Sequence, residues 1–269
     1  MAGRPTGACR LCGLVRPLCK SHLLPKQLYS LLHDPDDPKH FTLGTGRLNH
    51  TMRQIHEYLL CEECEERFNS GGERWVLANS LQSSGDFPLR DALRAAKPFV
   101  KLQDSIAYLG SAPGVDLDKL VYFAASVFWR TSVGKWSLTD RWFGNDSKVD
   151  FGPIYNEELR LFLMTERTFP ANAVLVVYVA DEDSPYTTVT FAGGGRQKEG
   201  HFQYSFQIPG MMFFLVLGKS IPDHIRGLCA VNNPVARLIF LTKFPNEFTR
   251  RWTAEKMATL SDSEKAILK

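Results

Sequence analysis

The sequence predicts an α+β protein in which a metal-pinned N-terminal module precedes a helical layer and a C-terminal, mostly antiparallel sheet with helices. Three observations predict this class. The first 75 residues hold five of the six cysteines and five of the seven histidines, and they lack regular apolar periodicity. Apolar residues at helical spacing dominate from Glu73 to about residue 166. Beyond residue 172, short β-branched and aromatic runs lie between Gly, Pro and Asp, as strands do.

Length and composition are those of an ordinary globular protein. A chain of 269 residues is long enough for one large domain or two moderate ones. Its 44% hydrophobic and 23% charged residues allow a sizeable core without crosslinks. The formal net charge of +3 permits contact with nucleic acid, but it is not the strongly basic balance of a dedicated binding domain.

The sequence predicts no membrane segment. No apolar run reaches the roughly 18 residues that a span needs, and the most apolar one, 211–217, predicts a buried strand. Residues 1–20 alternate arginines, a lysine and cysteines without an apolar core, so a signal peptide is not expected. We therefore expect a cytoplasmic protein, in whose reducing surroundings paired cysteines more often bind metal than form disulfides.

The first 75 residues need something other than an apolar core to fold them, and a bound metal supplies it. They include loop-like stretches at 33–38 and 44–46. Four thiolates form the tetrahedral ligand set that structural zinc prefers. Two Cys-x-x-Cys pairs provide that set: Cys9, Cys12, Cys61 and Cys64. Buried or redox-active thiols are the alternative, but a redox motif needs one pair and not two. Cys19 and Cys229 are expected to be ordinary buried cysteines.

The residues beside the two pairs predict how the module is built. Gly13 follows the first pair, as in a knuckle turn. The apolar run 58–60 leads into the second pair, and a charged helix is expected to begin there, over 62–69. A knuckle at one end and a helix N-terminus at the other form the treble-clef arrangement.

Helices are expected to follow this module. Six apolar residues at roughly helical spacing begin the layer: Trp75, Val76, Leu77, Leu89, Leu93 and Phe99. Residues 117–131 predict a long, mostly buried helix, and 154–166 a further one. The segment 144–153 between them is rich in Gly, Asp and Asn and is expected to be a linker. Helices at 245–257 and 261–268 are expected to close the chain.

Five short strands are expected in the C-terminal part: 173–180, 187–191, 202–207, 211–217 and 236–241. Phe202, Tyr204 and Phe206 alternate with polar residues, which is the pattern of a half-buried strand. The glycine run 193–195 is expected to form a hairpin turn between two strands. It lacks the following helix and lysine that would make it a phosphate-binding loop.

Two segments carry a family resemblance: Lys-Ser-His-Leu-Leu-Pro-Lys at 20–26 and Leu-Leu-Cys-Glu-Glu-Cys-Glu at 59–65. They resemble the HNH, or ββα-metal, nucleases, in which Asp-His-Ile-x-Pro ends a strand and Leu-Leu-Cys-x-x-Cys-His opens a helix. The Ser-His and Cys-x-x-Cys-Glu variant is similar to a group of bacterial HNH-like proteins. The resemblance covers about the first 75 residues. It implies a nuclease module at 1–75 and says nothing about the rest of the chain. The sequence pattern predicts a helical and α+β domain of unknown role at 76–269, with a candidate sub-boundary near 144–153.

The resemblance implies roles for five residues. His22 corresponds to the general-base histidine of the family, and Ser21 stands where a metal-binding aspartate or histidine is usual. Glu65 corresponds to the metal ligand after the last zinc cysteine, and Asn69 to a second ligand four residues on. His56 takes the place of the asparagine that orients the base.

Elementary chemistry is consistent with these roles. Glu65 and Asn69 are four residues apart and share a helix face, and their oxygens suit Mg²⁺ or Mn²⁺. Such an ion polarises the scissile phosphate while neutral His22 removes a proton from water. Simpler alternatives remain: His22 fixes its loop, Glu65 is a solvated charge at a helix N-terminus, Asn69 stops the helix, and His56 lies on the surface.

The sequence therefore predicts a metal-dependent DNA endonuclease with structural zinc, of the kind that acts against foreign DNA by family analogy. The alternative is a non-catalytic treble-clef module that binds nucleic acid or a protein partner, and Ser21 in place of an acidic ligand favours it. Six basic residues near the site are candidates for phosphate contacts: Lys20, Lys26, Arg47, Arg53, Arg67 and Arg74. Acidic residues nearly cancel their charge, so only clustering would make a binding patch.

Overall fold

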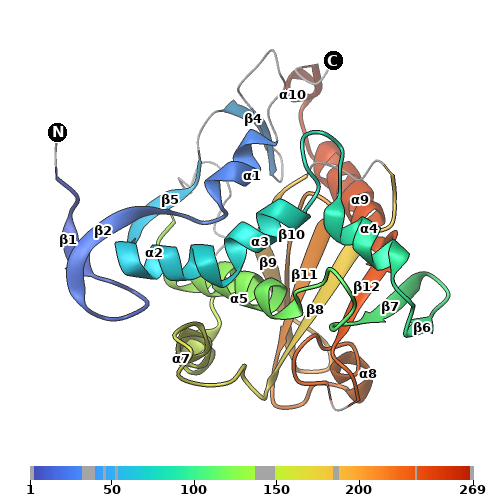
Figure 1. Cartoon of the computed structure of the whole chain (residues 1–269). Helices are drawn as coiled ribbons and strands as arrows, with labels where there is room; N and C mark the ends of the chain where they lie inside the picture. The colour runs from blue at the N-terminus through green and yellow to red at the C-terminus, as the bar shows by residue number, and fades with distance from the viewer. Residues whose placement is uncertain are drawn as a thin grey trace.

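The computed structural model describes residues 3–31, 40–44, 47–51, 54–136, 149–183, 188–233 and 235–266. The chain is a mixed α+β protein built around a seven-stranded sheet (Figure 1), so the predicted class is confirmed. The strand order is β6 (Val100–Lys101), β7 (Ser105–Leu109), β12 (Leu238–Thr242), β8 (Ala173–Ala180), β11 (Met211–Leu217), β10 (Phe202–Ile208) and β9 (Thr190–Arg196). Neighbouring strands are antiparallel except β12 and β8, which are parallel.

The main core lies between one face of this sheet and helix α5 (Leu117–Val133). Phe128 packs edge-to-face on Phe206 of β10 with ring centroids 4.9 Å apart, and Phe123 meets Phe213 of β11 at 5.7 Å. Such aromatic contacts add to the stabilisation that burial alone gives. Helix α5 was expected from its apolar run and extends two residues beyond the predicted end.

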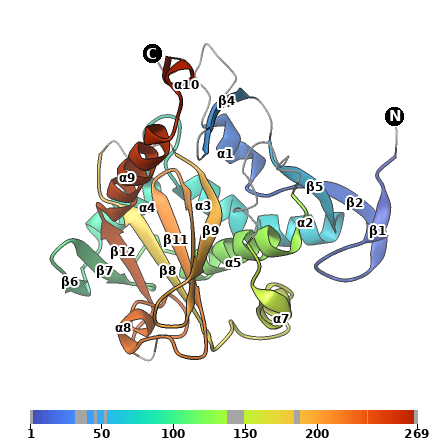
Figure 2. The same cartoon turned by 180° about the vertical axis from the view of Figure 1, so that it is seen from behind.

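The opposite face of the sheet carries helices α9 (Phe244–Ala258) and α8 (Asp223–Arg226), which lie near opposite ends of the strands (Figure 2). Tyr178 of β8 packs there against Phe240 of β12, at 5.5 Å, and against Phe244 of α9 at the same distance. Helix α7 (Gly152–Leu163) packs on α5, and α10 (Asp262–Ala266) follows α9.

The sequence expectation for the glycine run was wrong. The glycine run 193–195 lies inside strand β9 and not in a hairpin turn. Gly193 pairs with Ser205 and Gly194 with Tyr204 of β10. Gly194 has φ +150°, and a Cβ atom at this position would lie 2.0 Å from the carbonyl oxygen of Gln203. The glycines therefore permit close strand pairing rather than a reversal of the chain.

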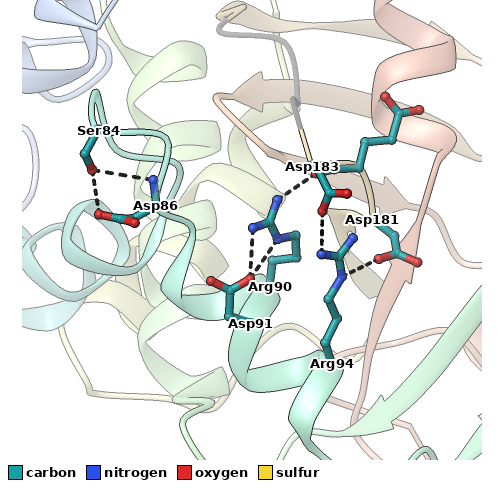
Figure 3. A network of polar contacts seen from close by, with 8 residues as sticks. Ser84, Asp86, Arg90, Asp91, Arg94, Asp181 and Asp183 are labelled. Atoms are coloured by element: carbon teal, nitrogen blue, oxygen red, sulfur yellow. Dashed lines mark hydrogen bonds and ion pairs between the residues drawn. The ribbon is translucent and has the colours of Figure 1, made fainter.

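Helix α4 (Pro88–Ala95) is fastened to the end of β8 by two arginines (Figure 3). Arg94 bonds the carboxylates of Asp181 and Asp183, both at 2.8 Å, and Arg90 donates to the carbonyl oxygen of Glu182 at 2.7 Å. These charge-assisted bonds hold a helix whose buried face carries Leu89 and Leu93. Leu89 and Leu93 were expected in the helical layer and lie in α4, whereas Phe99, expected there too, lies outside a helix. Strands β6 and β7 were not among the elements expected from the sequence.

The N-terminal part contains a second sheet, with strands in the order β1 (Thr6–Ala8), β2 (Val15–His22) and β5 (His56–Cys61). Helix α1 (Lys26–Ser30) follows β2, and the hairpin of β3 (His40–Gly44) and β4 (Arg47–Thr51) precedes β5. The predicted loop at 33–38 and residues 144–148 of the predicted linker lie outside the described residues.

Three helical segments run on without a break after β5: α2 (Glu62–Phe68), the π-helical turn η1 (Asn69–Glu73) and α3 (Arg74–Asn79). Gly71 and Gly72 lie inside this run, where a Cβ on Gly71 would meet Tyr122 at 2.3 Å and one on Gly72 would meet the Lys119 carbonyl at 2.6 Å. The glycines thus let the run cross α5 closely, and the expected module end at residue 75 falls within it. No helix in the described ranges has the length and apolarity to cross a membrane.

Candidate functional site

Four cysteines converge where β5 passes into α2. Their Sγ atoms all lie within 4.8 Å of one another, and those of Cys12 and Cys61 are 3.9 Å apart. Thiolates about 2.3 Å from a tetrahedral zinc ion are roughly 3.8 Å from each other, so the donor set fits this ion. The expected meeting of the two pairs is confirmed, and the group is a candidate zinc site.

Backbone hydrogen bonds shape the loop that carries the first pair. The N–H of Gly13 donates to the Cys9 carbonyl at 2.8 Å, and Gly13 has φ +76°, which glycine adopts without strain. The N–H of Arg10 donates to the carbonyl of Leu59 at 3.1 Å. Because Leu59 lies in the strand that leads to Cys61, this bond holds the loop beside the second pair.

The thiols of the group lie close enough together for Cys9 and Cys64 to shift each other's pKa. A hydrogen bond from Cys64 lowers the pKa of Cys9 to about 4, against the opposing effect of burial. The pKa of Cys64 is raised, because it is the donor to Cys9 and is itself desolvated. The thiolate is the form that binds zinc, and a coordinated ion removes the remaining protons. Of the other two cysteines, Cys229 is buried and Cys19 is half-buried.

A polar contact joins β2 to α2 next to the cysteines. Ser21, only 1% exposed, donates its hydroxyl to Oε1 of Glu65 and accepts the N–H of Leu60 at 3.2 Å. Burial raises the pKa of Glu65, whereas the Ser21 hydrogen bond and the charge of Arg130 lower it. The structure thus brings together two residues to which the sequence resemblance gave metal-ligand positions.

His22 ends strand β2 and is half-buried. Its Nε2 lies 3.0 Å from Oε1 of Gln54, and its ring meets that of His56 edge-to-face at 5.9 Å. Burial lowers the pKa of His22 most, and the charges of His56, Lys26 and Lys20 lower it further, against the Gln54 hydrogen bond. A histidine with a lowered pKa is neutral at neutral pH, which is the state a general base requires.

The side chains of His22 and Glu65, both described in the structure, have different contact partners. Successive strand residues point to opposite faces, so the His22 ring and the Ser21 hydroxyl leave β2 in opposite directions. Ser21 faces Glu65, whereas His22 faces His56, with which it is paired in the β2–β5 register.

Arg130 of α5 connects the two sides of the site. It is 1% exposed, donates from Nη1 to the His22 carbonyl at 3.0 Å and from Nη2 to Glu73 Oε1 at 2.6 Å. Its guanidinium also lies 5.3 Å from the centre of the Phe68 ring. Glu73 is close enough to Glu65 for its charge to raise the pKa of Glu65. A buried cation therefore lies among two carboxylates and the backbone of the candidate base.

The side chain of Asn69 contacts Glu66 rather than Glu65. Its Nδ2 donates to Oε2 of Glu66 at 3.0 Å, and Arg74 bonds the same carboxylate at 3.1 Å. Its expected role as a metal ligand beside Glu65 therefore stays a prediction.

The basic residues near the site differ in whether a neighbouring acceptor already binds them. Those along α2 are paired, because Arg4 bonds Glu62, Arg16 bonds Glu63 and Arg74 bonds Glu66. Arg67 donates to the carbonyl of Met164. Lys20 and Lys26 are exposed near His22 and have no acidic partner among the described residues. Arg53 and the side chain of Arg47 lie outside those residues.

Three residues of this site were not found from the sequence: Gln54, Glu73 and Arg130. Gln54 carries no motif, and Gly71 and Gly72 stand between Glu65 and Glu73, so the sequence gives no sign of a shared helix face. Arg130 did give a usable signal, since a charged residue near the end of an apolar, buried helix requires a partner.

Comparison with known proteins adds no family. No protein-family model matches the chain, and neither the curated proteins nor the solved structures contain a match. Function is therefore inferred from the residues and their geometry.

Proposed function

We propose that the chain is a metal-dependent endonuclease of the HNH, or ββα-metal, type that hydrolyses phosphodiester bonds in DNA. One arrangement carries the proposal: the cysteine group fixes the start of α2 beside the end of β2, so that Ser21 contacts Glu65 and His22 follows directly. A Cys-x-x-Cys loop, strand β2, antiparallel strand β5 and helix α2 occur in the order of the family's ββα element, with α1 and the β3–β4 hairpin inserted between β2 and β5. In this proposal zinc holds the element together as a treble clef.

His22 serves as the general base in this proposal. With its Nε2 proton donated to Oε1 of Gln54, its Nδ1 carries the lone pair that accepts a proton from water. The carbonyl bond from Arg130 fixes the backbone of His22, and the His56 ring limits its rotation.

Glu65 is the first candidate to hold a divalent ion, with the Ser21 hydroxyl beside it. Carboxylate and hydroxyl oxygens suit Mg²⁺ or Mn²⁺. Asn69 would join them only after leaving Glu66. When bound, the ion supplies positive charge that polarises the scissile phosphate and stabilises the leaving oxygen.

A non-catalytic zinc module that binds nucleic acid or a protein partner is the second candidate, and Arg130 favours it. Its guanidinium bonds Glu73 and acts on Glu65, so a resident cation already offsets the acidic pair. In that case Ser21, Glu65 and Arg130 only fasten the N-terminal sheet to α5.

Cleavage of supercoiled plasmid and of single-stranded circular DNA tests the choice, with Mg²⁺ or Mn²⁺ added to zinc-loaded protein. We expect His22→Ala to lose at least about a hundredfold in rate, as general bases contribute about 10²–10⁴-fold. His224→Ala, on the exposed part of α8, is the matched control and is expected to cut like wild type. Equal cutting by His22→Ala and wild type, or none by either with any divalent ion, would favour the non-catalytic module.

A further inference from the structure

One face of the N-terminal sheet carries Lys20 and Tyr58, which the mechanism above does not use, next to His22 and His56, which it does. In the β2–β5 register Lys20 is paired with Tyr58, and His22 with His56. Paired residues point to the same side of a sheet, and so do residues two apart along a strand. These four side chains therefore share one face, which we call the β2–β5 face: Lys20, His22, His56 and Tyr58.

This face is accessible where the strands leave the core. Tyr58 is 49% exposed and Lys20 is exposed, whereas Ser21 on the opposite face is 1% exposed. Cross-strand partners lie about 5 Å apart and diagonal neighbours about 7–8 Å apart. The exposed ring of Tyr58 is thus a diagonal cross-strand neighbour of His22, the candidate base.

The charge at this face is positive. The groups that act most strongly on His22 by charge are His56, Lys26 and Lys20. The arginines along α2 are offset by glutamates, but within the described ranges no carboxylate pairs with Lys20 or Lys26. The two lysines, one on the β2–β5 face and one at the start of α1, are therefore available to bind anions near His22.

We propose that the β2–β5 face binds single-stranded nucleic acid, with one base stacked on Tyr58 and neighbouring phosphates at Lys20 and Lys26. The inference rests on the proposed nuclease function, since it names the substrate of the same site. An aromatic ring beside a cationic track is the combination that holds unpaired strands. A duplex offers only its phosphates here, because its base faces are stacked on one another.

Fluorescence anisotropy with a labelled oligothymidylate and a labelled hairpin duplex tests the inference, in buffer without Mg²⁺ or Mn²⁺. Wild type is expected to prefer the single strand. Tyr58→Leu keeps an apolar side chain but removes stacking, so single-strand affinity should fall roughly 5- to 150-fold while duplex affinity changes little. Lys20→Gln and Lys26→Gln should each lower the slope of log affinity against log salt by about 0.7.

Matched controls lie at the far edge of the large sheet, where Phe99 is 48% exposed and Lys101 is exposed (Figure 1). Phe99→Leu and Lys101→Gln should leave affinity and salt slope unchanged. The inference is overturned if wild type binds the duplex as tightly as the single strand, or if Tyr58→Leu leaves single-strand affinity within twofold.

The two proposals fail in different ways. Tyr58-dependent binding without any cleavage would refute the nuclease and leave the β2–β5 face as a binding surface. If the protein cleaves DNA and Tyr58→Leu changes neither the cleavage rate nor the affinity for the single strand, the stacking inference is refuted and the nuclease proposal stands.

Discussion

Replacing Arg130 by methionine should destabilise the protein more than any surface substitution. The change removes a guanidinium that bonds the His22 carbonyl, Glu73 and the Ser126 carbonyl, and it leaves Glu73, whose side chain is 13% exposed, without its partner. Removing one member of a buried ion pair costs about 3–5 kcal/mol, because the other charge stays buried. Since domains are stable by about 5–15 kcal/mol, this is a large fraction of the total.

Urea unfolding followed by tryptophan fluorescence measures this loss. Glu73→Gln in the Arg130→Met background removes the stranded charge, so the double variant should be more stable than the sum of the single losses predicts, by about 0.5–3 kcal/mol. Arg251→Met, whose side chain is 84% exposed and pairs with Glu255, should stay within about 0.5 kcal/mol of wild type. A loss below 1 kcal/mol for Arg130→Met, or strict additivity with Glu73→Gln, would refute the reasoning.

Three further predictions concern the metal, the base and the helix crossing. Cys61→Ala should abolish the one-to-one zinc content measured by inductively coupled plasma mass spectrometry, whereas Cys229→Ser should keep it, because only Cys61 belongs to the four-cysteine group. The lowered pKa of His22 keeps its neutral form to more acid pH, so the cleavage rate should be half-maximal below about pH 6.5. Lys26→Glu should raise that pKa and move the rate profile to higher pH, and an unmoved profile would count against His22 as base. Gly72→Ala should lower stability by about 1–3 kcal/mol, because its Cβ would lie 2.6 Å from the Lys119 carbonyl, whereas Gly195→Ala meets nothing within 4 Å and should be tolerated in thermal unfolding.

The sequence predicted elements best where a single periodicity decides the structure. Strands β8 and β11 have the predicted bounds, since their continuous apolar runs fit only the middle of a sheet covered on both faces. Helix α5 was found for a similar reason. The glycines of β9 were misjudged, because glycine marks both chain reversals and close packing, and only the neighbouring residues decide between them. The helix expected over 62–69 likewise continues through the glycines of η1 into α3.

In the candidate site, too, the residues that local sequence specifies were predicted and those that depend on distant contacts were not. The four cysteines could be predicted because spacing and ligand chemistry are both written locally in the sequence. The family resemblance gave Ser21 and Glu65 metal-ligand positions, but their direct contact was not predicted. The role of Arg130 could not be predicted, because it depends on α5 packing against residues that lie 57 and 108 positions away along the chain.

Arg130 also separates the two candidate functions. In a nuclease, a divalent ion at Glu65 is repelled by the guanidinium, whose charge acts on that carboxylate. Removing the guanidinium should therefore tighten Mn²⁺ binding, measured by electron paramagnetic resonance at a temperature where Arg130→Met is still folded. In a non-catalytic module Arg130 takes the place of the ion, and neither form should bind Mn²⁺ at Glu65. Glu65→Gln distinguishes this site from other carboxylates, because it should abolish the gain in the first case and change nothing in the second.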